Sequence, residues 1–405
     1  MPLVSLAYAI ATLALAPFFG FLAIVTVAAL LRRQGAGSGP LPETLPRFLF
    51  VIPAHDEQPS IAATVASCRA VDYAPTDFAV LVIADNCSDA TASVARAAGA
   101  EVVERLNPER RSKGFALEDV LGQMTASGEL AHYAAVVLVD ADTLVDRNLL
   151  LAFARVLDAG ADWAQCYYTV RNPDASWRTR LLTYAFSLFN GVWLLGQDSL
   201  GLSVGFRGNG MCLSTRALAR IPWRANGLVE DQEFSWQLRL AGERVRFVPS
   251  TRVYAEMVSR GQAAVSQRRR WEEGRRALRS AVRGPLLASR VLGPVHKLLS
   301  LLELVFPPLV ALLSTLLAVL TIHPLALFLP RLDPVSSLLL PFHAAMLIIF
   351  ILYALSPFLT LGLPLRYLTS LSALPYYAAW KTYATFRSRT TSWVRTRREA
   401  TAREA

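Results

Sequence analysis

Three long stretches without charge limit what this chain can fold into. Residues 3–31 contain no Asp, Glu, Lys, Arg or His, residues 304–330 contain only His323, and residues 335–365 contain only His343. Each stretch is longer than the roughly 20 residues that a helix needs to cross a bilayer. The chain has 405 residues, of which 53% are hydrophobic and 18% charged. This composition is typical of a membrane protein and excludes a disordered or collagen-like chain.

The charges beside the first stretch favour a membrane anchor over a cleaved signal peptide. Arg32 and Arg33 follow the stretch at once, whereas a signal peptide has a basic start and a shorter apolar core. Positive charge marks the cytoplasmic side of a span. We therefore predict a transmembrane anchor over residues 1–34, with the following domain in the cytoplasm.

The two later stretches predict two transmembrane helices within residues 301–366. We expect His343 to be satisfied inside the helix bundle or near the outer interface rather than to be a ligand. We expect Glu303 to be an end residue whose carboxylate extends to water, with a functional intramembrane group as the alternative. Residues 367–405 predict an interfacial segment, or a short fourth span, followed by a basic tail. From residue 381 the tail has seven Lys or Arg and two Glu. Three spans in total leave this basic tail in the cytoplasm, whereas a fourth would place it outside, so the positive-inside rule favours three.

The net charge of +10 is concentrated next to the membrane stretches. Between Arg260 and Lys297 there are ten Lys or Arg and two Glu, and residues 276–300 are predicted as a basic interfacial helix region. Anionic lipid headgroups are the usual partner of such a segment, so no nucleic acid is expected. The four cysteines form no CxxC pair, which argues against a zinc or disulfide framework.

Residues 47–275 predict one α/β domain. Apolar runs at 47–53, 78–84, 100–106 and 134–139 alternate with helical patterns, with Ser60 as a candidate cap of the first helix. This alternation predicts a mostly parallel sheet with helices on both faces. Such a sheet binds ligands at the carboxyl ends of its strands.

Polar side chains follow three of these strands. His55, Asp56 and Glu57 follow the first, Asp85 and Asp89 the second, and Asp140 and Asp142 the fourth. A helix cap is an equally good interpretation of Asp89. The Asp-Ala-Asp pattern after a buried strand instead offers oxygen ligands to a hard cation, which can neutralise a diphosphate.

The ordered motifs VIPAHDE, DNCSD, KGFAL, DADT, LVEDQEFSWQLRLAGERVRFVP and QRRRW are more specific together. The chain resembles the membrane-bound family 2 glycosyltransferases, the group of cellulose, chitin-oligosaccharide and poly-N-acetylglucosamine synthases and of ceramide glucosyltransferase. The resemblance implies a GT-A-type nucleotide-sugar-binding domain at the cytoplasmic face of a bacterial inner (plasma) membrane. It covers residues 47 to about 275 and the flanking apolar stretches.

The resemblance also implies roles for individual residues. Those expected to bind the donor, with uracil as the base, are Pro53, Ala54, His55, Glu57, Asp85, Lys113 and Asp140. Asp140 and Asp142 would ligate Mg²⁺ or Mn²⁺, and Glu230 and Asp231 would form the catalytic pair, with Asp231 as the base. Lys113 has an alternative interpretation as a solvated lysine, and the acidic pair as helix-capping residues.

Two further motifs are expected to contact substrate. Gly208, Asn209 and Gly210 resemble an acceptor loop, although a plain turn explains them nearly as well. Gln267 and Arg270 of QRRRW would hold the diphosphate or order the acceptor site, and Trp271 would pack on a sugar. A basic surface helix is the alternative interpretation.

These observations predict an inverting transferase that moves a sugar from a UDP-sugar to a polysaccharide or oligosaccharide. A glycolipid synthase with a polyprenyl phosphate, diacylglycerol or ceramide-like acceptor is the close alternative. A transporter or receptor would need polar groups along its spans, and these stretches contain almost no ionisable residues.

Overall fold

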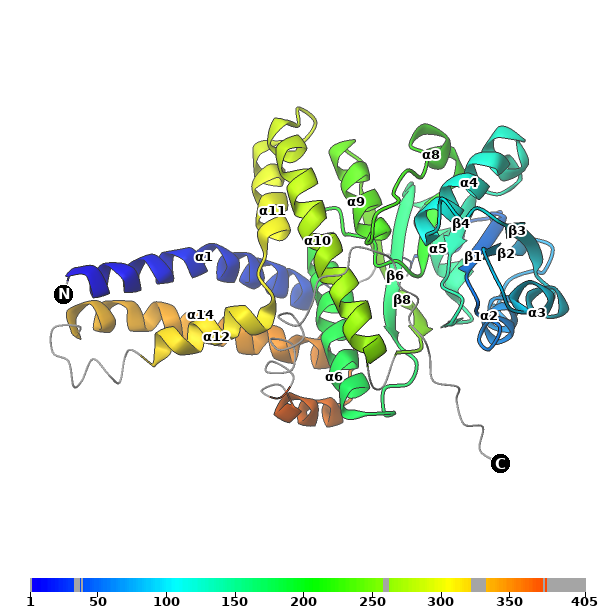
Figure 1. Ribbon diagram of the computed structural model, residues 1–405. Coiled ribbons are helices and arrows are strands. Elements are labelled where there is room, and N and C mark those ends of the chain that lie inside the picture. The colour runs from blue at the N-terminus through cyan, green and yellow to red at the C-terminus, as the bar shows by residue number, and fades with distance from the viewer. Residues whose placement is uncertain are drawn as a thin grey trace.

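The chain folds into an α/β domain with a helical arm. The computed structural model describes residues 2–32, 37, 39–257, 262–321, 333–373 and 376. The arm contains α1 (Pro2–Leu31), α12 (Leu309–Leu320) and α14 (Asp333–Thr360), which lie side by side and project from the domain (Figure 1). The predicted basic tail lies outside the described residues.

The domain is built on one mixed sheet in the order β3-β2-β1-β4-β7-β6-β8-β5. Its strands are β1 (Phe48–Ala54), β2 (Phe78–Asp85), β3 (Glu101–Arg105), β4 (Ala135–Leu138), β5 (Thr143–Val145), β6 (Trp163–Val170), β7 (Met211–Ser214) and β8 (Val245–Ala255). The first four strands are those predicted from the apolar runs, and they pair in parallel. The antiparallel β7 joins this half to the parallel pair β6 and β8.

Helices cover both faces of the sheet, as the alternation of patterns predicted. In the domain they are α2 (Ile61–Arg69), α3 (Thr91–Ala97), α4 (Lys113–Ala126), η1 (Glu129–His132), α5 (Leu149–Asp158), α6 (Trp177–Phe186), the π-helix η2 (Ser187–Val192), α7 (Trp193–Ser199), α8 (Thr215–Arg220) and α9 (Glu230–Leu240). Then α10 (Gln262–Ala288) and α11 (Pro294–Val305) lead to the arm, and η3 (Leu365–Ala373) follows α14. One helix, α10, therefore crosses the predicted boundary at residue 275.

Alternate residues of β1 enter two different cores, because successive side chains of a strand point to opposite faces. Phe48 and Phe50 pack with α2 and α5. Leu49 and Val51 belong to the core on the other face, which also contains residues of α4, α9 and the arm helices. The α/β domain and the arm thus share one continuous core, which holds them in a fixed relationship.

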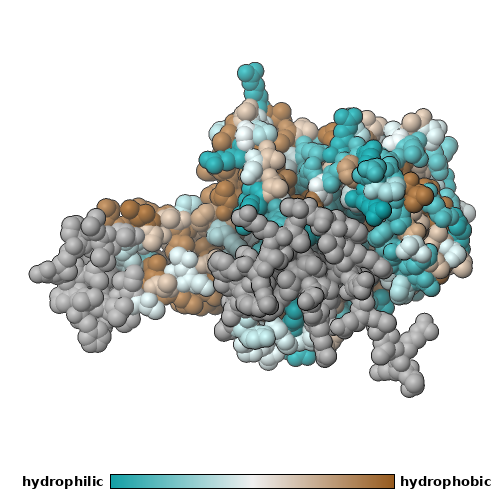
Figure 2. All heavy atoms as spheres, viewed as in Figure 1, coloured by the Kyte–Doolittle hydropathy of each residue, from teal (hydrophilic) through white to brown (hydrophobic). Residues whose placement is uncertain are grey.

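Two helices of the described chain are long and apolar enough to cross a membrane. They are Tyr8–Leu31 and Leu338–Thr360, and apolar residues gather on the arm while polar residues dominate the α/β domain (Figure 2). α11 and α12 are separated by a short break and bent by 86°, so they make a third candidate span only if the bent pair counts as one span. Pro307 and Pro308 lie at this break, where proline removes the backbone N–H groups that would continue the helix. Residues 322–330 of the predicted span over 304–330 lie outside the described residues.

Three smaller predictions have clear outcomes. The buried His343 hydrogen-bonds to Tyr8 and Thr12 of α1, so its predicted place inside the bundle is confirmed. Glu303 does not reach for water as predicted, since its Oε2 accepts from Arg239 Nη1 at 2.7 Å. Ser60 does not cap α2 with its side chain, because its hydroxyl donates to Glu57.

Candidate active site

Polar loops meet at the carboxyl edge of the parallel strands. β2, β1 and β4 are neighbours, so the residues that follow them lie along one edge of the sheet. His55 follows β1 and lies with its Nδ1 2.7 Å from the carbonyl oxygen of Asp85 at the end of β2. Asp140 follows β4. The structure therefore brings the three predicted loops together.

Two of these loops contain strained backbone. Asp56 has φ +53° and Asn86 has φ +51°, and among the described residues they are the two non-glycine positions with positive φ. Such conformations cost about 1 kcal/mol or more and are common at functional sites. Side-chain bonds hold them, because the Asp56 carboxylate accepts from the Ser88 N–H at 2.6 Å and Asn86 Nδ2 donates to Asp85 at 2.8 Å.

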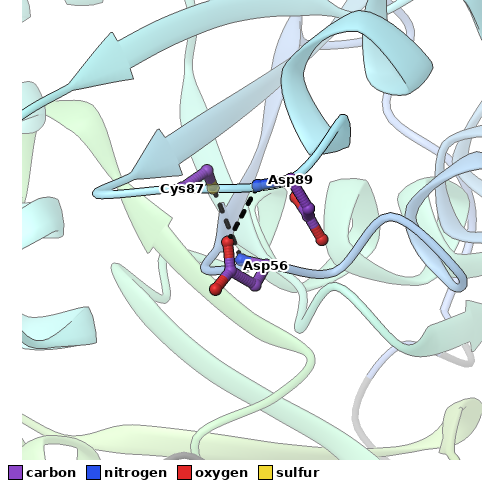
Figure 3. Close-up of side chains that lie close together, drawn as sticks. All are labelled: Asp56, Cys87 and Asp89. Carbon is purple, nitrogen blue, oxygen red and sulfur yellow. Dashed lines mark hydrogen bonds between the residues drawn. The ribbon is translucent and has the colours of Figure 1, made fainter.

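The same loops gather Asp56, Cys87 and Asp89, whose ligand-type atoms lie within 4.8 Å of one another (Figure 3). The Asp89 N–H donates to Asp56 Oδ1 at 3.3 Å, and Asp89 Oδ2 accepts from the backbone N–H of Gln58 at 3.2 Å. Burial raises the pKa of the Cys87 thiol, which keeps it protonated at neutral pH. The cluster is accounted for by bonds that join the two loops.

Asp85 forms an ion pair that the sequence analysis did not identify. Its Oδ1 accepts from Arg105 Nη1 at 2.5 Å, and Arg105 Nη2 donates to Asp119 at 2.7 Å. Burial raises the pKa of Asp85, and the Arg105 guanidinium opposes that rise. Arg105 orients the carboxylate predicted to contact the nucleoside. It stands at the carboxyl end of β3, so the rule that pointed to the other edge residues could have found it.

Lys113 lies at the centre of an acidic group. Its Nζ donates to Asp140 Oδ1 at 2.5 Å and to the carbonyl oxygen of Gly208, and it lies 3.9 Å from Glu230 Oε1. Burial would lower the pKa of Lys113, but the neighbouring carboxylates raise it, so the ammonium stays charged. The alternative interpretation of Lys113 as a solvated lysine is wrong.

Local structure sets where Lys113 begins its helix. The Ser112 hydroxyl accepts from the Phe115 N–H at 3.2 Å and caps α4. Gly114 packs so closely on the backbone of Ala225 that a Cβ atom would collide with the Ala225 carbonyl oxygen. The first turn of α4 therefore packs directly on the segment that leads into α9.

Glu230 and Asp231 are half-buried in the first turn of α9, where the Glu230 side chain is 17% exposed. Burial raises the pKa of Glu230 to about 7, since the opposing effect of Lys113 is smaller and Asp231 adds repulsion. Burial also raises the pKa of Asp231, against hydrogen bonding from the Gln232 backbone and attraction to Lys113. The helix N-terminus favours negative charge here, so a capping role and the predicted catalytic role are compatible, and the catalytic role stays a prediction.

The predicted acceptor loop reaches the same place. Gly208 has φ +79° and lies next to the Asp231 carboxylate, and Gly210 has φ +66°. Asn209 is fully buried, accepts from the Asp140 N–H at 3.2 Å and donates to Thr143 Oγ1 at 2.7 Å. Its side chain supports the Asp140 loop, which differs from the substrate contact that we predicted.

Asp140 and Asp142 have the right chemistry for a hard cation, because carboxylate oxygens are the ligands that Mg²⁺ and Mn²⁺ prefer. Asp142 is 8% exposed, and its Oδ1 accepts from Thr143 Oγ1 at 3.3 Å. Within the described chain the pair belongs to no group of three metal-ligating side chains. The two residues fit an ion that takes its other ligands from water or a bound diphosphate.

The QRRRW segment lies on α10, which packs against α9. Gly274, three residues after Trp271, lies close to the side chains of Leu228 and Val229, just before Glu230. Arg270 and Trp271 are half-buried, while the side chain of Gln267 lies outside the described residues. Substrate contacts of this segment stay a prediction.

With this geometry in place, the comparison with known proteins decides the family. The family described as glycosyltransferase like family 2 matches residues 46–274, more than half of the chain. The chain belongs to this glycosyltransferase family. Its matched range covers the whole sheet and every edge residue described above.

A solved structure supports the fold of this glycosyltransferase. Mannosyltransferase PcManGT from Pyrobaculum calidifontis, in complex with GDP-Man and Mn²⁺, has a TM-score of 0.54 at 18% identity, over 86% of this chain and 98% of that one. TarS from S. aureus with UDP-GlcNAc is 16% identical over 77% and 90%, with a TM-score of 0.44. Glucosyl-3-phosphoglycerate synthase from Mycobacterium tuberculosis with Mg²⁺ and UDP is 20% identical over 56% and 77%, with a TM-score of 0.38. No curated protein matches significantly.

Proposed function

We propose that this family 2 glycosyltransferase transfers a sugar, with inversion, from a nucleotide sugar to a glycan acceptor at the cytoplasmic face of a membrane. The observation that carries the proposal is the placement of Lys113, within 3.9 Å of both Asp140 and Glu230. A charged lysine among carboxylates at the strand edge suits a polyanionic donor. The solved structures above were determined with GDP-Man, UDP-GlcNAc and UDP, and we expect UDP here.

Asp231 is the group that we assign as the base. In a single displacement the acceptor hydroxyl loses its proton as its oxygen attacks the anomeric carbon, while the nucleoside diphosphate leaves from the opposite face. Burial raises the pKa of Asp231, which makes its carboxylate a stronger base than an exposed aspartate. Glu230 beside it, with its pKa raised to about 7, is only partly charged at neutral pH, and Lys113 compensates part of the negative charge of the pair.

Asp140 and Asp142 would hold Mg²⁺ or Mn²⁺. When bound, such an ion stabilises the negative charge that accumulates on the departing diphosphate. Lys113 supplies a fixed positive charge at the same edge, and Asn209 keeps the Asp140 loop in position through two hydrogen bonds. Asp85, oriented by Arg105, would accept from the base or ribose of the donor.

The arm places the reaction beside a bilayer in this proposal. α1 and α14 are apolar enough to span a membrane, and Arg32 follows α1 on the side of the domain, as the positive-inside rule expects for the cytoplasmic end. A growing polysaccharide or oligosaccharide is our first acceptor. A lipid acceptor is the second candidate, because the domain packs directly on the apolar arm, which would hold the candidate site close to the bilayer.

The test is nucleoside diphosphate release by the full-length protein in detergent, with a panel of UDP- and GDP-sugars and either Mg²⁺ or Mn²⁺. Asp231→Asn should lower turnover by about 10²-fold to 10⁴-fold. Asp72→Asn, which changes an exposed acid paired with Arg147, is the matched control and should leave turnover unchanged. Full turnover in both Asp231→Asn and Asp142→Asn would show that the assigned roles are wrong.

Product analysis then identifies the acceptor. A radiolabelled sugar that enters material retained by size exclusion indicates polymer synthesis, and label that partitions into organic solvent indicates a glycolipid. A product of inverted anomeric configuration is expected with either acceptor. Retention of configuration would contradict the single displacement.

A further inference from the structure

Three arginines surround one buried carboxylate where α1 meets the α/β domain. Asp198 has a fully buried side chain at the end of α7. Its Oδ1 accepts from Arg246 Nε at 2.8 Å and Arg244 Nη2 at 3.2 Å, and its Oδ2 lies 2.9 Å from Arg32 Nη1. Three positive charges and one negative charge leave the group at +2. None of these residues belongs to the candidate active site.

A hollow of about 450 Å³ opens beside this group. It is lined by Ala28, Leu31, Arg32, Asp198, Ser199 and Arg246. Ala28 and Leu31 form an apolar wall on the last turn of α1, whereas Arg32 and Arg246 form a cationic wall on the side of the domain. Asp198 is the acid among these described lining residues, and Arg32 and Arg246 already engage it.

The hollow lies where a membrane surface is expected. The candidate span Tyr8–Leu31 ends at this point, and Leu31 is 74% exposed. The headgroup layer of a bilayer begins where an apolar span ends. An apolar wall facing the bilayer and a cationic wall facing the domain match a molecule with acyl chains and a phosphate.

We propose that this hollow binds the phosphate group of an anionic phospholipid, with Arg32 and Arg246 as its ligands. Guanidinium groups match the geometry of phosphate oxygens, and they keep their charge at partly buried positions. Asp198 holds the arginines in place while neutralising one charge of three. The apolar wall favours a lipid over free phosphate, because only a lipid also covers Leu31.

The pKa of Arg244 also responds to the neighbouring arginines. Burial lowers the pKa of Arg244, and repulsion from Arg246 and Arg32 lowers it further, while Asp198 opposes the change. An added phosphate would relieve this repulsion. The inference goes beyond the transfer reaction and depends on α1 lying in a bilayer.

The experiment measures lipid binding to the full-length protein by native mass spectrometry in detergent, without any assay of turnover. Dioctanoyl phosphatidylglycerol should bind more tightly than dioctanoyl phosphatidylcholine. Arg246→Gln should weaken phosphatidylglycerol binding about fivefold, as expected for one lost basic residue at a membrane surface. The control Arg220→Gln removes an exposed arginine of α8 that pairs with Asp162, and it should leave the affinities for both lipids unchanged.

Three results would overturn the proposal. The first is equal affinity of the unaltered protein for the two lipids. The second is a loss of phosphatidylglycerol affinity in Arg220→Gln equal to that in Arg246→Gln. The third is displacement of phosphatidylglycerol by inorganic phosphate at the same concentration, which would indicate a free-anion site. If Arg246→Gln does not fold, photoactivatable phosphatidylglycerol tests the unaltered protein. Label on peptides with Ala28, Leu31 or Ser199 supports the site, and label confined to other regions contradicts it.

Discussion

The ammonium of Lys113 lies 2.5 Å from the Asp140 carboxylate, although the two residues are 27 positions apart and belong to different elements. Lys113 opens α4, and Asp140 follows β4. The same ammonium donates to the Gly208 carbonyl oxygen and lies near Glu230. One cation therefore connects the loop predicted for the donor to the loop and helix predicted for the acceptor.

Replacing this cation should reduce turnover strongly. Lys113→Met leaves Asp140, Glu230 and Asp231 without their common positive neighbour and removes a preorganised charge from the donor side. We expect turnover to fall by about 10²-fold or more in the nucleoside diphosphate release assay. Lys297→Met is the matched control, because Lys297 is a half-buried lysine of α11, outside the candidate site, whose ammonium donates to the Leu287 carbonyl oxygen. Similar rates for the two variants would exclude a special role for Lys113.

Removing Arg105 should destabilise the domain. Arg105→Met leaves the buried Asp85 without its main ionic partner, and we expect a loss of about 3 kcal/mol in the free energy of unfolding. The side chains of Arg96 and Glu104 are 51% and 61% exposed, so Arg96→Met should cost less than about 1 kcal/mol. Chemical denaturation in detergent measures both. Equal losses would mean that the Arg105 pair is no stronger than a surface pair.

Two glycines of α4 should respond in opposite directions. Gly114→Ala places a methyl group against the Ala225 carbonyl and should destabilise the protein by about 1–3 kcal/mol. Gly122 faces open space, because no atom beyond its chain neighbours and the backbone of its own helix lies within 4 Å of the point that a Cβ atom would occupy, so Gly122→Ala should stabilise the helix by about 0.5–1 kcal/mol. Thermal melting of the two variants compares them directly. A stable Gly114→Ala protein would contradict the close approach of α4 to residues 225–226.

The stability contributed by Asp162 should depend on pH. Burial alone would raise its pKa, but hydrogen bonds from Arg216 and Arg220 outweigh burial and lower it below the usual 3.8. A lowered folded-state pKa contributes stability above the unfolded value and loses it as pH falls through the folded value. Asp162→Asn should therefore melt below the unaltered protein at pH 7, and the difference in melting temperature should narrow as the pH falls below the usual pKa of 3.8. A gap of constant size would exclude the linkage.

Much of the framework follows from local pattern. Apolar runs identify β1 to β4, because buried parallel strands need continuous apolar residues, and the strand-edge rule places His55, Asp85 and Asp140 together. The pattern could not reveal that Arg105 pairs with Asp85, or that Asn209 is buried beneath the Asp140 loop. Those contacts depend on which strand neighbours which, and a single sequence does not specify strand order.

By itself the sequence determined the membrane-compatible helices, the alternating α/β pattern and the positions of carboxylates after strands, because hydrophobic length and periodicity are properties of neighbouring residues. Only the tertiary structure decided that Lys113 reaches Asp140, that Glu303 pairs with Arg239 and that α11 and α12 bend apart. These features join residues far apart in the chain. The free energy that stabilises these contacts comes from burial and charge pairing between different elements. The residues of one segment alone therefore do not specify them.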